Sequence, residues 1–257
     1  MTSYNSLKPE EFFADTQLDM GRAILGADMP RIEQLLPQVD LNAHGKHGIS
    51  LLLLAVNQAI PEQDNANSMR WQVIRRLVQA GAAVDDQSTE AGQISPLSIA
   101  LKAKSPYFLR ALLDGGMSPN ATLYREPILP EVARDASLDS LKLLVERGAH
   151  VNARDSLGET ALFGSSAMLQ VETVKYLLSN GADVSVVNRA GVSYGWSLKI
   201  RFERADANNP QVRQMMAIQN NLVKEGKLKW PPDEPLTERD RMRARGETPI
   251  IPAGQTR

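Results

Sequence analysis

Apolar residues along the chain recur at helical spacing and then stop at a glycine. Val174, Leu177 and Leu178 lie three and four residues apart, so they form one apolar stripe on a helix. Gly181 follows this stripe, where a left-handed residue commonly ends a helix. Similar runs end at Gly81, Gly116 and Gly148. The four glycines lie 32 to 35 residues apart, which predicts a chain built from helical repeats.

Each predicted pair of helices begins at a small hydroxyl residue. Ser50, Ser95 and Thr160 stand directly before an apolar helical run. Their side-chain oxygens are expected to cap the first helix by accepting a backbone N–H bond. Pro96 suits the first helical turn, because its missing donor would have no partner there. The pattern therefore predicts a tight turn and two antiparallel helices in each repeat.

Residues 157–184, LGETALFGSSAMLQVETVKYLLSNGADV, resemble one complete ankyrin repeat. Such a unit cannot bury its apolar face alone and needs neighbours on both sides. The resemblance extends over about residues 18–228. It implies an all-α solenoid of about five to six helix-turn-helix units, degenerate caps included, with short β-hairpin turns.

The resemblance also suggests a domain organisation. We expect residues 1–17 to be a polar lead-in, residues 18–228 a single ankyrin-repeat domain and residues 229–257 a Pro-rich charged tail. In the N-terminal cap, helices are predicted over 18–25 and 29–36, before a first hairpin at 39–50.

Three irregular segments depart from the repeat pattern. The second unit is about ten residues too long, and we place the excess in 57–68, as a solvent loop, a lengthened helix end or a binding insertion. Pro127 and Pro130 are expected to distort the first helix of the fourth unit. A helix over 211–225 is predicted to seal the end of the stack, with Trp230 clasping this cap.

Composition excludes several classes of function. The chain has no cysteine, which rules out disulfide scaffolds and thiol chemistry. A net charge of −1 without an aromatic-lined basic patch gives no case for nucleic-acid binding. No apolar stretch approaches the roughly 18 residues of a membrane helix. The first residues lack a signal sequence, so we expect a periplasmic location if a signal peptide was removed and a cytoplasmic one otherwise.

No group of residues forms a convincing catalytic or metal-binding set. His44 and His47 share a predicted turn without a nearby carboxylate or thiol to complete a metal site, and His150 occupies a variable turn position. Ser165 and Ser166 lie within a predicted helix rather than in a nucleophile elbow. We therefore expect no catalytic residue, no metal and no cofactor, and a protein that is not an enzyme.

The ankyrin resemblance implies that turn tips and first helices form a protein-binding surface. The implied tip residues are His44, Lys46, His47, Asp86, Gln87, Glu90, Tyr124, Arg125, Arg154, Asp155, Ser156, Asn188 and Arg189. The implied first-helix residues are Leu53, Ser98, Phe163, Met168 and Trp196. Leu53, Ser98 and Phe163 replace a frequent histidine of the family, and Leu53 and Phe163 are either apolar anchors for a partner or packing residues between first helices.

A narrower resemblance suggests the partner. The LNAHGKHGISLLLLAV segment, the Asn-rich insertion and the Trp-Pro-Pro tail resemble bacterial ankyrin proteins encoded beside lipase effectors of type VI secretion. The resemblance implies an immunity protein, a monomer when free, that covers the active site of a toxic phospholipase-type enzyme. The alternative is a cytoplasmic ankyrin scaffold or regulator of another bacterial protein.

Overall fold

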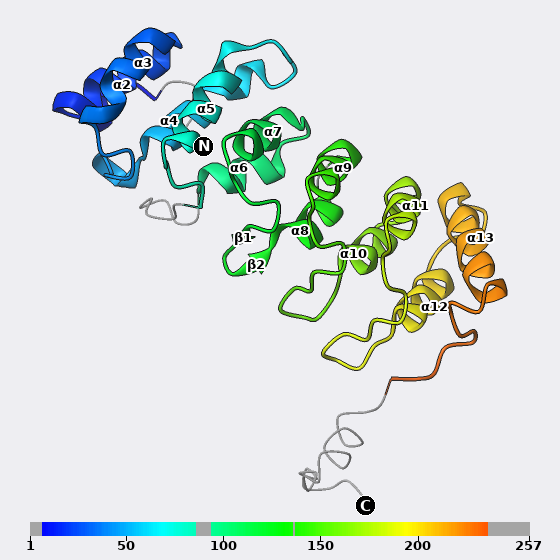
Figure 1. Cartoon of the computed structure of the whole chain (residues 1–257). Helices are drawn as coiled ribbons and strands as arrows, with labels where there is room; N and C mark the ends of the chain where they lie inside the picture. The colour runs from blue at the N-terminus through cyan, green and yellow to red at the C-terminus, as the bar shows by residue number, and fades with distance from the viewer. Residues whose placement is uncertain (1–6, 86–93, 136, 236–257) are drawn as a thin grey trace, which may run out of the picture. The chain divides into compact units, whose positions relative to one another are not determined.

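The computed structural model describes residues 7–85, 94–135 and 137–235 (Figure 1). By its internal contacts the chain divides into two compact units, Met1–Ala153 and Arg154–Arg257, whereas the sequence predicted one repeat domain over 18–228. In both units most of the described residues that form regular elements are helical. The all-helical fold class with short hairpins that the sequence predicted is confirmed.

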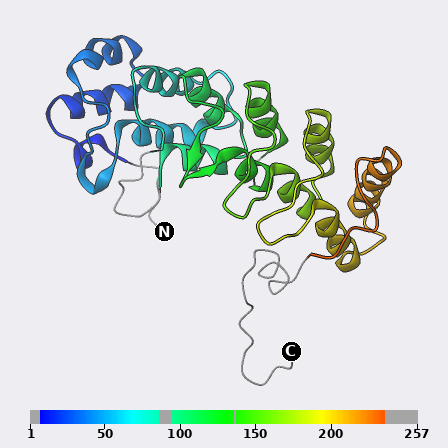
Figure 2. The same ribbon diagram turned by 60° about the horizontal axis from the view of Figure 1, so that its bottom comes forward.

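The first unit consists of helix pairs that pack on their neighbours (Figures 1 and 2). Its α-helices are α1 (Pro9–Phe12), α2 (Asp15–Gly26), α3 (Met29–Leu35), α4 (Leu51–Ala59), α5 (Met69–Gln79), α6 (Pro96–Lys102), α7 (Tyr107–Asp114), α8 (Ile128–Asp135) and α9 (Leu138–Glu146). Short 3₁₀ turns cover Leu36–Gln38, Lys46–Gly48 and Ile60–Glu62, and strands β1 (Thr122–Leu123) and β2 (Glu126–Pro127) form an antiparallel hairpin. The first helices α2, α4, α6 and α8 contact one another in sequence order, and α5 packs on α7.

The second unit repeats this arrangement with two helix pairs. Its helices are α10 (Ala161–Ala167), α11 (Val171–Ser179), α12 (Tyr194–Arg204) and α13 (Pro210–Lys224). First helix α10 packs on α12, and second helix α11 packs on α13. Helix α13 agrees with the predicted helix over 211–225.

The repeated glycines have the left-handed conformation that the sequence predicted. Their φ angles lie between 85° and 104° at Gly81, Gly116, Gly148 and Gly181. After each glycine, the next residue donates its N–H to a carbonyl five positions earlier, as from Ala149 to Leu144 at 2.9 Å. This Schellman arrangement satisfies carbonyls that the helix end leaves open. Gly226 ends α13 in the same way, because Lys227 donates its N–H to the Leu222 carbonyl at 2.8 Å.

Two of the three predicted helix caps are confirmed. Ser50 Oγ accepts the Leu53 N–H at 3.2 Å, and Ser95 forms a reciprocal capping box with Ser98. The prediction for Thr160 is wrong: its buried Oγ1 has no hydrogen-bond partner in the described part of the chain. The Phe163 N–H that it would cap donates instead to the Thr160 backbone carbonyl at 3.0 Å.

The predicted insertion at 57–68 is ordered by its own polar side chains. The 3₁₀ turn Ile60–Glu62 lengthens α4, and a loop then leads to α5. The Glu62 carboxylate accepts hydrogen bonds from Ser68 Oγ and, at 2.9 Å, from Arg70 Nε. Trp71 Nε1 donates to the Asn65 carbonyl at 2.7 Å. The insertion thus combines a lengthened helix end with a fixed loop.

The prolines of the fourth unit do not distort its first helix, which corrects the prediction. Pro127 ends strand β2, and α8 begins at Ile128. Pro130 therefore falls in the first turn of α8, where backbone N–H groups have no intrahelical acceptor to lose.

Both ends of the described chain pack on their own units. The lead-in contains α1, and Phe13 behind it is buried. Helix α2 begins at Asp15, three positions before the prediction, while α3 ends at Leu35, one position early. At the other end the Trp230 ring lies 6.3 Å from the ring of Phe202 on α12. This contact confirms that Trp230 clasps the C-terminal cap; residues 236–257 of the predicted tail lie outside the described residues.

Asparagine side chains join neighbouring repeats of the first unit. Asn42 Nδ2 donates to the Gly81 carbonyl at 3.0 Å, and its Oδ1 accepts the Ala83 N–H at 2.8 Å. Asn120 makes the equivalent pair with Gly148 O and His150 N at 3.2 and 2.7 Å. Each asparagine is therefore hydrogen-bonded to the backbone of the following repeat, at and just after the glycine that ends its second helix.

Candidate protein-binding surface

The first turn of unit 1 carries three of the predicted tip residues. His44, Lys46 and His47 are all exposed. The residues 39–50 form a turn closed by a 2.9 Å bond from Gly45 N to Ile49 O, where the sequence predicted a hairpin. Glycine is required at position 45, because a Cβ there would lie 2.5 Å from the Phe12 carbonyl oxygen. The turn is thus packed against the N-terminal segment, and this packing leaves the side chains of His44, Lys46 and His47 exposed to solvent.

Tyr124 and Arg125 form the tip of the β1–β2 hairpin. Leu123 pairs with Glu126, so the connecting loop has two residues. Both have positive φ, 54° at Tyr124 and 67° at Arg125, as a type I′ turn requires. Asparagine and glycine are the residues that fit such a turn easily, whereas large side chains are strained there. Both side chains are nevertheless exposed, and neither belongs to the core.

The surroundings of Tyr124 favour the protonated form of its phenol. Partial burial, and then the negative charge of Asp85, raise the pKa of Tyr124 above its usual value near 10. A phenol with the usual pKa is already protonated at neutral pH, so the raised pKa only extends to higher pH the range over which the hydroxyl keeps its proton. The predicted tip residues Asp86, Gln87 and Glu90, which follow Asp85, lie outside the described residues.

The first turn of unit 2 divides its predicted residues between surface and framework. Arg154 is exposed, and it donates from Nη1 to the Val187 carbonyl at 3.2 Å. Ser156 is exposed as well. Asp155 is buried, and its Oδ1 accepts the N–H groups of Leu157 and Glu159 at 3.0 and 2.9 Å. The prediction of Asp155 as a contact residue is corrected, because its carboxylate holds the turn together.

The second turn of unit 2 shows the same division. Asn188 is half-buried; its Oδ1 accepts the N–H groups of Ala190 and Val192 at 3.0 Å, and its Nδ2 donates to Glu159 Oε1 at 3.0 Å. Asn188 therefore shapes the turn, and the predicted contact role is corrected for it too. Arg189 has an exposed side chain, while its backbone N–H donates to the Leu157 carbonyl at 2.8 Å.

The first helices offer less surface than predicted. Leu53, Ser98 and Phe163 are 3 to 4% exposed. Phe163 packs edge to face on Tyr194 of α12, with ring centroids 5.6 Å apart. The prediction of Phe163 as a partner contact is corrected, and the alternative of packing between neighbouring first helices is confirmed. Met168 is 59% exposed at the end of α10, and Trp196 is half-buried beneath the Lys199 ammonium, 4.4 Å from the ring centroid.

The sequence reasoning missed two apolar tip residues of unit 2. Leu157 and Val187 are 60% and 45% exposed, and they stand in the two turns that Arg154 and Arg189 join by hydrogen bonds. The available signal was a large apolar residue directly before the Gly158 turn, where a polar residue is expected.

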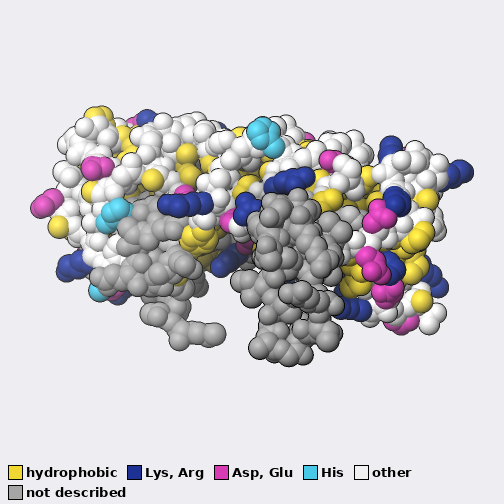
Figure 3. All heavy atoms as spheres, turned by 90° about the horizontal axis from the view of Figure 1, so that it is seen from below, with side chains coloured by type: hydrophobic (Ala, Val, Ile, Leu, Met, Phe, Trp, Pro, Cys, Tyr) yellow, Lys and Arg dark blue, Asp and Glu magenta, His cyan; other side chains and the backbone are white. Residues whose placement is uncertain are grey.

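The surface has mixed chemistry and no metal-binding cluster in the part that the structure describes. Figure 3 shows basic, acidic and apolar side chains scattered over the visible described residues. Within the described ranges no group of three His, Cys, Asp or Glu residues is placed to hold a metal. Among the described helices, none has the length and hydropathy needed to span a membrane.

Comparisons with known proteins agree with this geometry. Residues 129–178 match the family model for ankyrin repeats (many copies). The neurogenic locus notch homolog protein 2 of Homo sapiens is 28% identical over 171 residues, which make up 64% of this chain but only 7% of that protein. The chain thus spans a small part of this curated relative.

Solved structures show the same fold at low identity. An ankyrin repeat domain from Acinetobacter baumannii superposes with a TM-score of 0.55 at 20% identity, covering 78% of this chain and 97% of that one. A chain from the complex of a predatory endopeptidase of Bdellovibrio bacteriovorus with an immunity protein gives a TM-score of 0.53 at 18% identity, covering 77% and 97%. The ankyrin-repeat fold predicted from the sequence is thus confirmed.

Proposed function

We propose that this protein is a non-catalytic module that binds another protein through its turn tips, with Tyr124 and Arg125 as the main contacts of unit 1. The turn geometry carries this proposal. Two bulky residues occupy left-handed positions that Asn-Gly would fill without strain. Strain of this kind is typical of functional positions. Tyr and Arg are also the side chains that most often dominate binding energy at protein interfaces.

The finer proposal is that the partner is an antibacterial phospholipase-type enzyme and that this chain is its immunity protein. The narrower sequence resemblance supports this role. The likeness to a chain from an endopeptidase–immunity protein complex supports it at the level of the fold. In this proposal a preformed solenoid covers the active site of the enzyme with little loss of conformational entropy on binding. Its place of action is the periplasm after export.

The proposal requires that a phospholipase-type enzyme is encoded beside this gene, and the test uses that enzyme. Both proteins are co-expressed, the complex is isolated by size-exclusion chromatography, and hydrolysis of phospholipid vesicles is measured with and without this chain. We expect a stable complex and loss of hydrolysis. Failure of both would contradict the immunity role, and recovery of a cytoplasmic partner instead would favour the scaffold alternative.

A turn variant tests the proposed contact separately. Tyr124→Asn/Arg125→Gly keeps the turn type but removes the phenol and the guanidinium, so we expect the dissociation constant to rise by about a hundredfold. The control is Arg213→Ala/Lys224→Ala, which changes two exposed residues of α13 and is expected to bind as the wild type does. Unchanged binding of the turn variant would move the interface elsewhere on the chain.

A further inference from the structure

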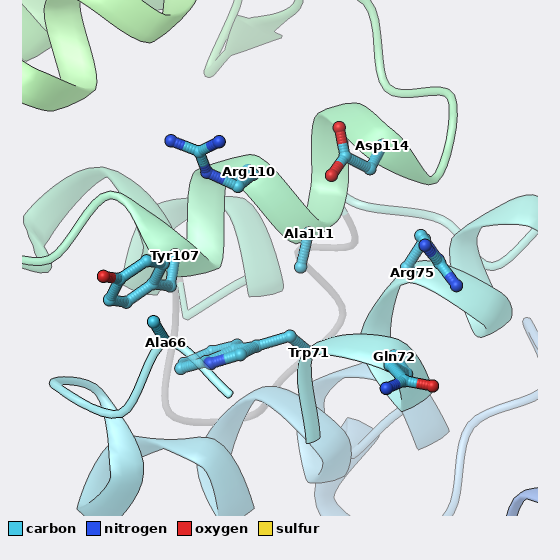
Figure 4. Close-up of a pocket in the computed structure, with 8 residues that line it drawn as sticks. All are labelled: Ala66, Trp71, Gln72, Arg75, Tyr107, Arg110, Ala111 and Asp114. Atoms are coloured by element: carbon cyan, nitrogen blue, oxygen red, sulfur yellow. The ribbon is translucent and has the colours of Figure 1, made fainter. Parts of the chain in front are cut away.

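A groove lies between second helices α5 and α7 of unit 1, with a volume of about 410 Å³ (Figure 4). Figure 4 shows Trp71 and Ala111 between the two helices, with Tyr107 and Ala66 at one end. The Trp71 and Tyr107 rings have centroids 6.0 Å apart. Ala66 belongs to the insertion loop, so the segment that breaks the repeat pattern builds one wall of this groove.

The two helices approach closely at the far end of the groove. A Cβ at Gly115, directly after α7, would lie 2.5 Å from Val78 Cβ and 2.9 Å from the Arg75 carbonyl oxygen. Only glycine therefore allows this contact. At the other end the large rings of Trp71 and Tyr107 occupy the space between the helices.

The charges around the groove are unbalanced. Arg75 on α5 and Arg110 on α7 are exposed lining residues, and neither forms an ion pair within the described part of the chain. Asp114 is the carboxylate among the lining residues, and Arg147 neutralises it at 2.7 Å. Two arginines are thus left without a carboxylate beside an aromatic floor.

We propose that this groove docks an acidic segment of a partner protein, with an apolar side chain on Trp71 and Tyr107 and carboxylates on Arg75 and Arg110. The charge complementarity selects an acidic occupant. The volume suits one or two side chains, because ligand pockets have about 300–1,000 Å³. Arg, Trp and Tyr together are the composition of a binding hot spot. The site is separate from the Tyr124–Arg125 hairpin, which projects from the opposite side of unit 1 in Figure 1.

The experiment selects peptides from a random dodecapeptide library displayed on phage. Wild-type protein is the target, and Arg75→Glu/Arg110→Glu is the counter-selection target. We expect enriched peptides that combine Asp or Glu with Leu, Phe or Trp. Labelled copies should bind the wild type with an affinity that falls as salt is added, and they should bind the variant about tenfold or more weakly.

The matched control is Arg213→Glu/Lys224→Glu, which makes the same change in net charge on exposed positions of α13. It should bind the selected peptides nearly as the wild type does. Equal losses in both variants would mean that only net charge matters, and would overturn the proposal. Peptides without acidic residues, or no enrichment at all, would overturn it as well. Circular dichroism of each variant shows that the fold is kept.

Discussion

The Trp71 indole packs edge to face on the ring of Phe108, with centroids 4.8 Å apart and an interplanar angle of 79°. This pair connects helix α5, which follows the insertion, to helix α7 of the next repeat. Trp71 Nε1 also donates a hydrogen bond to the Asn65 carbonyl. One side chain therefore stabilises both the insertion loop and the packing of α5 on α7.

Substitutions at Trp71 should separate these two roles. Trp71→Ala removes a side chain that is 8% exposed, so we expect a loss of about 3–5 kcal/mol in the free energy of unfolding. Trp71→Phe keeps most of the packing and loses the bond to Asn65, for a loss of about 1 kcal/mol. Urea denaturation measures both losses. An unchanged stability of Trp71→Phe would show that the hydrogen bond contributes nothing of its own, and equal losses in the two variants would contradict the larger role given to packing.

A pair of glycine substitutions tests the left-handed helix ends. Gly148→Ala should lose about 1–2 kcal/mol of stability, because φ is 93° although no atom lies within 4 Å of the added Cβ. Gly26→Ala, at the end of α2, also meets no atom and has no positive φ. It should therefore leave stability unchanged or raise it by up to about 1 kcal/mol. Thermal unfolding distinguishes the two, and equal shifts would contradict the conformational argument.

The Tyr124–Arg125 turn is expected to be less stable than the same turn formed by Asn and Gly. Tyr124→Asn/Arg125→Gly replaces strained residues by those that a type I′ turn favours, so stability should rise by about 1–2 kcal/mol. The measurement is the urea midpoint of the free protein. A gain in stability with a loss of partner binding would show a trade-off between the two; no gain would remove the argument from strain.

The stability of the first unit should fall at low pH because of Glu62 in the insertion. Hydrogen bonds from Ser68 and then Arg70 lower the pKa of Glu62 from its usual 4.5. Since the folded-state pKa is the lower one, the stabilisation is present above pH 4.5 and is lost as the pH falls through the folded-state pKa. Urea midpoints from pH 7 down to pH 3 should fall less for Glu62→Gln than for the wild type. A parallel decline, with exposed Glu172→Gln as the control, would contradict this account.

The stability of the second unit should fall at high pH because of Tyr194. Burial raises the pKa of Tyr194 to about 12, although its 2.9 Å hydrogen bond with Ser166 partly opposes this shift. Because the folded-state pKa exceeds the usual value of 10, its stabilising contribution is present below pH 10 and is lost as the pH rises towards 12. Absorbance at the tyrosinate band should show one late-titrating tyrosine that is absent in Tyr194→Phe. Titration of every tyrosine near pH 10 would contradict the burial.

Local rules predicted the fold well and the surface less well. The glycine ends and the Ser50 and Ser95 caps depend on a few adjacent residues, so the sequence was sufficient to predict them. Thr160 failed because a backbone 3₁₀ bond competes with its side chain for the same donor. Pro130 was misjudged because the start of α8 depends on where the β1–β2 hairpin ends.

The candidate surface depends on contacts between repeats. Phe163 and Asp155 look like surface residues in the repeat pattern, but their neighbours in unit 2 bury them. The α5–α7 groove combines the insertion loop with residues from two repeats. The sequence pattern of one repeat therefore cannot predict this groove.

Each glycine end closes its hydrogen bonds on residues of its own helix, as Ala149 does with Leu144. These helix-end bonds lie within one repeat, while Asn42 and Asn120 add side-chain hydrogen bonds to the following repeat. Such a chain can come apart in steps and reassemble from whichever repeats remain folded. A force or a protease acting at one end would then shorten the folded array by whole repeats, instead of unfolding it in a single event.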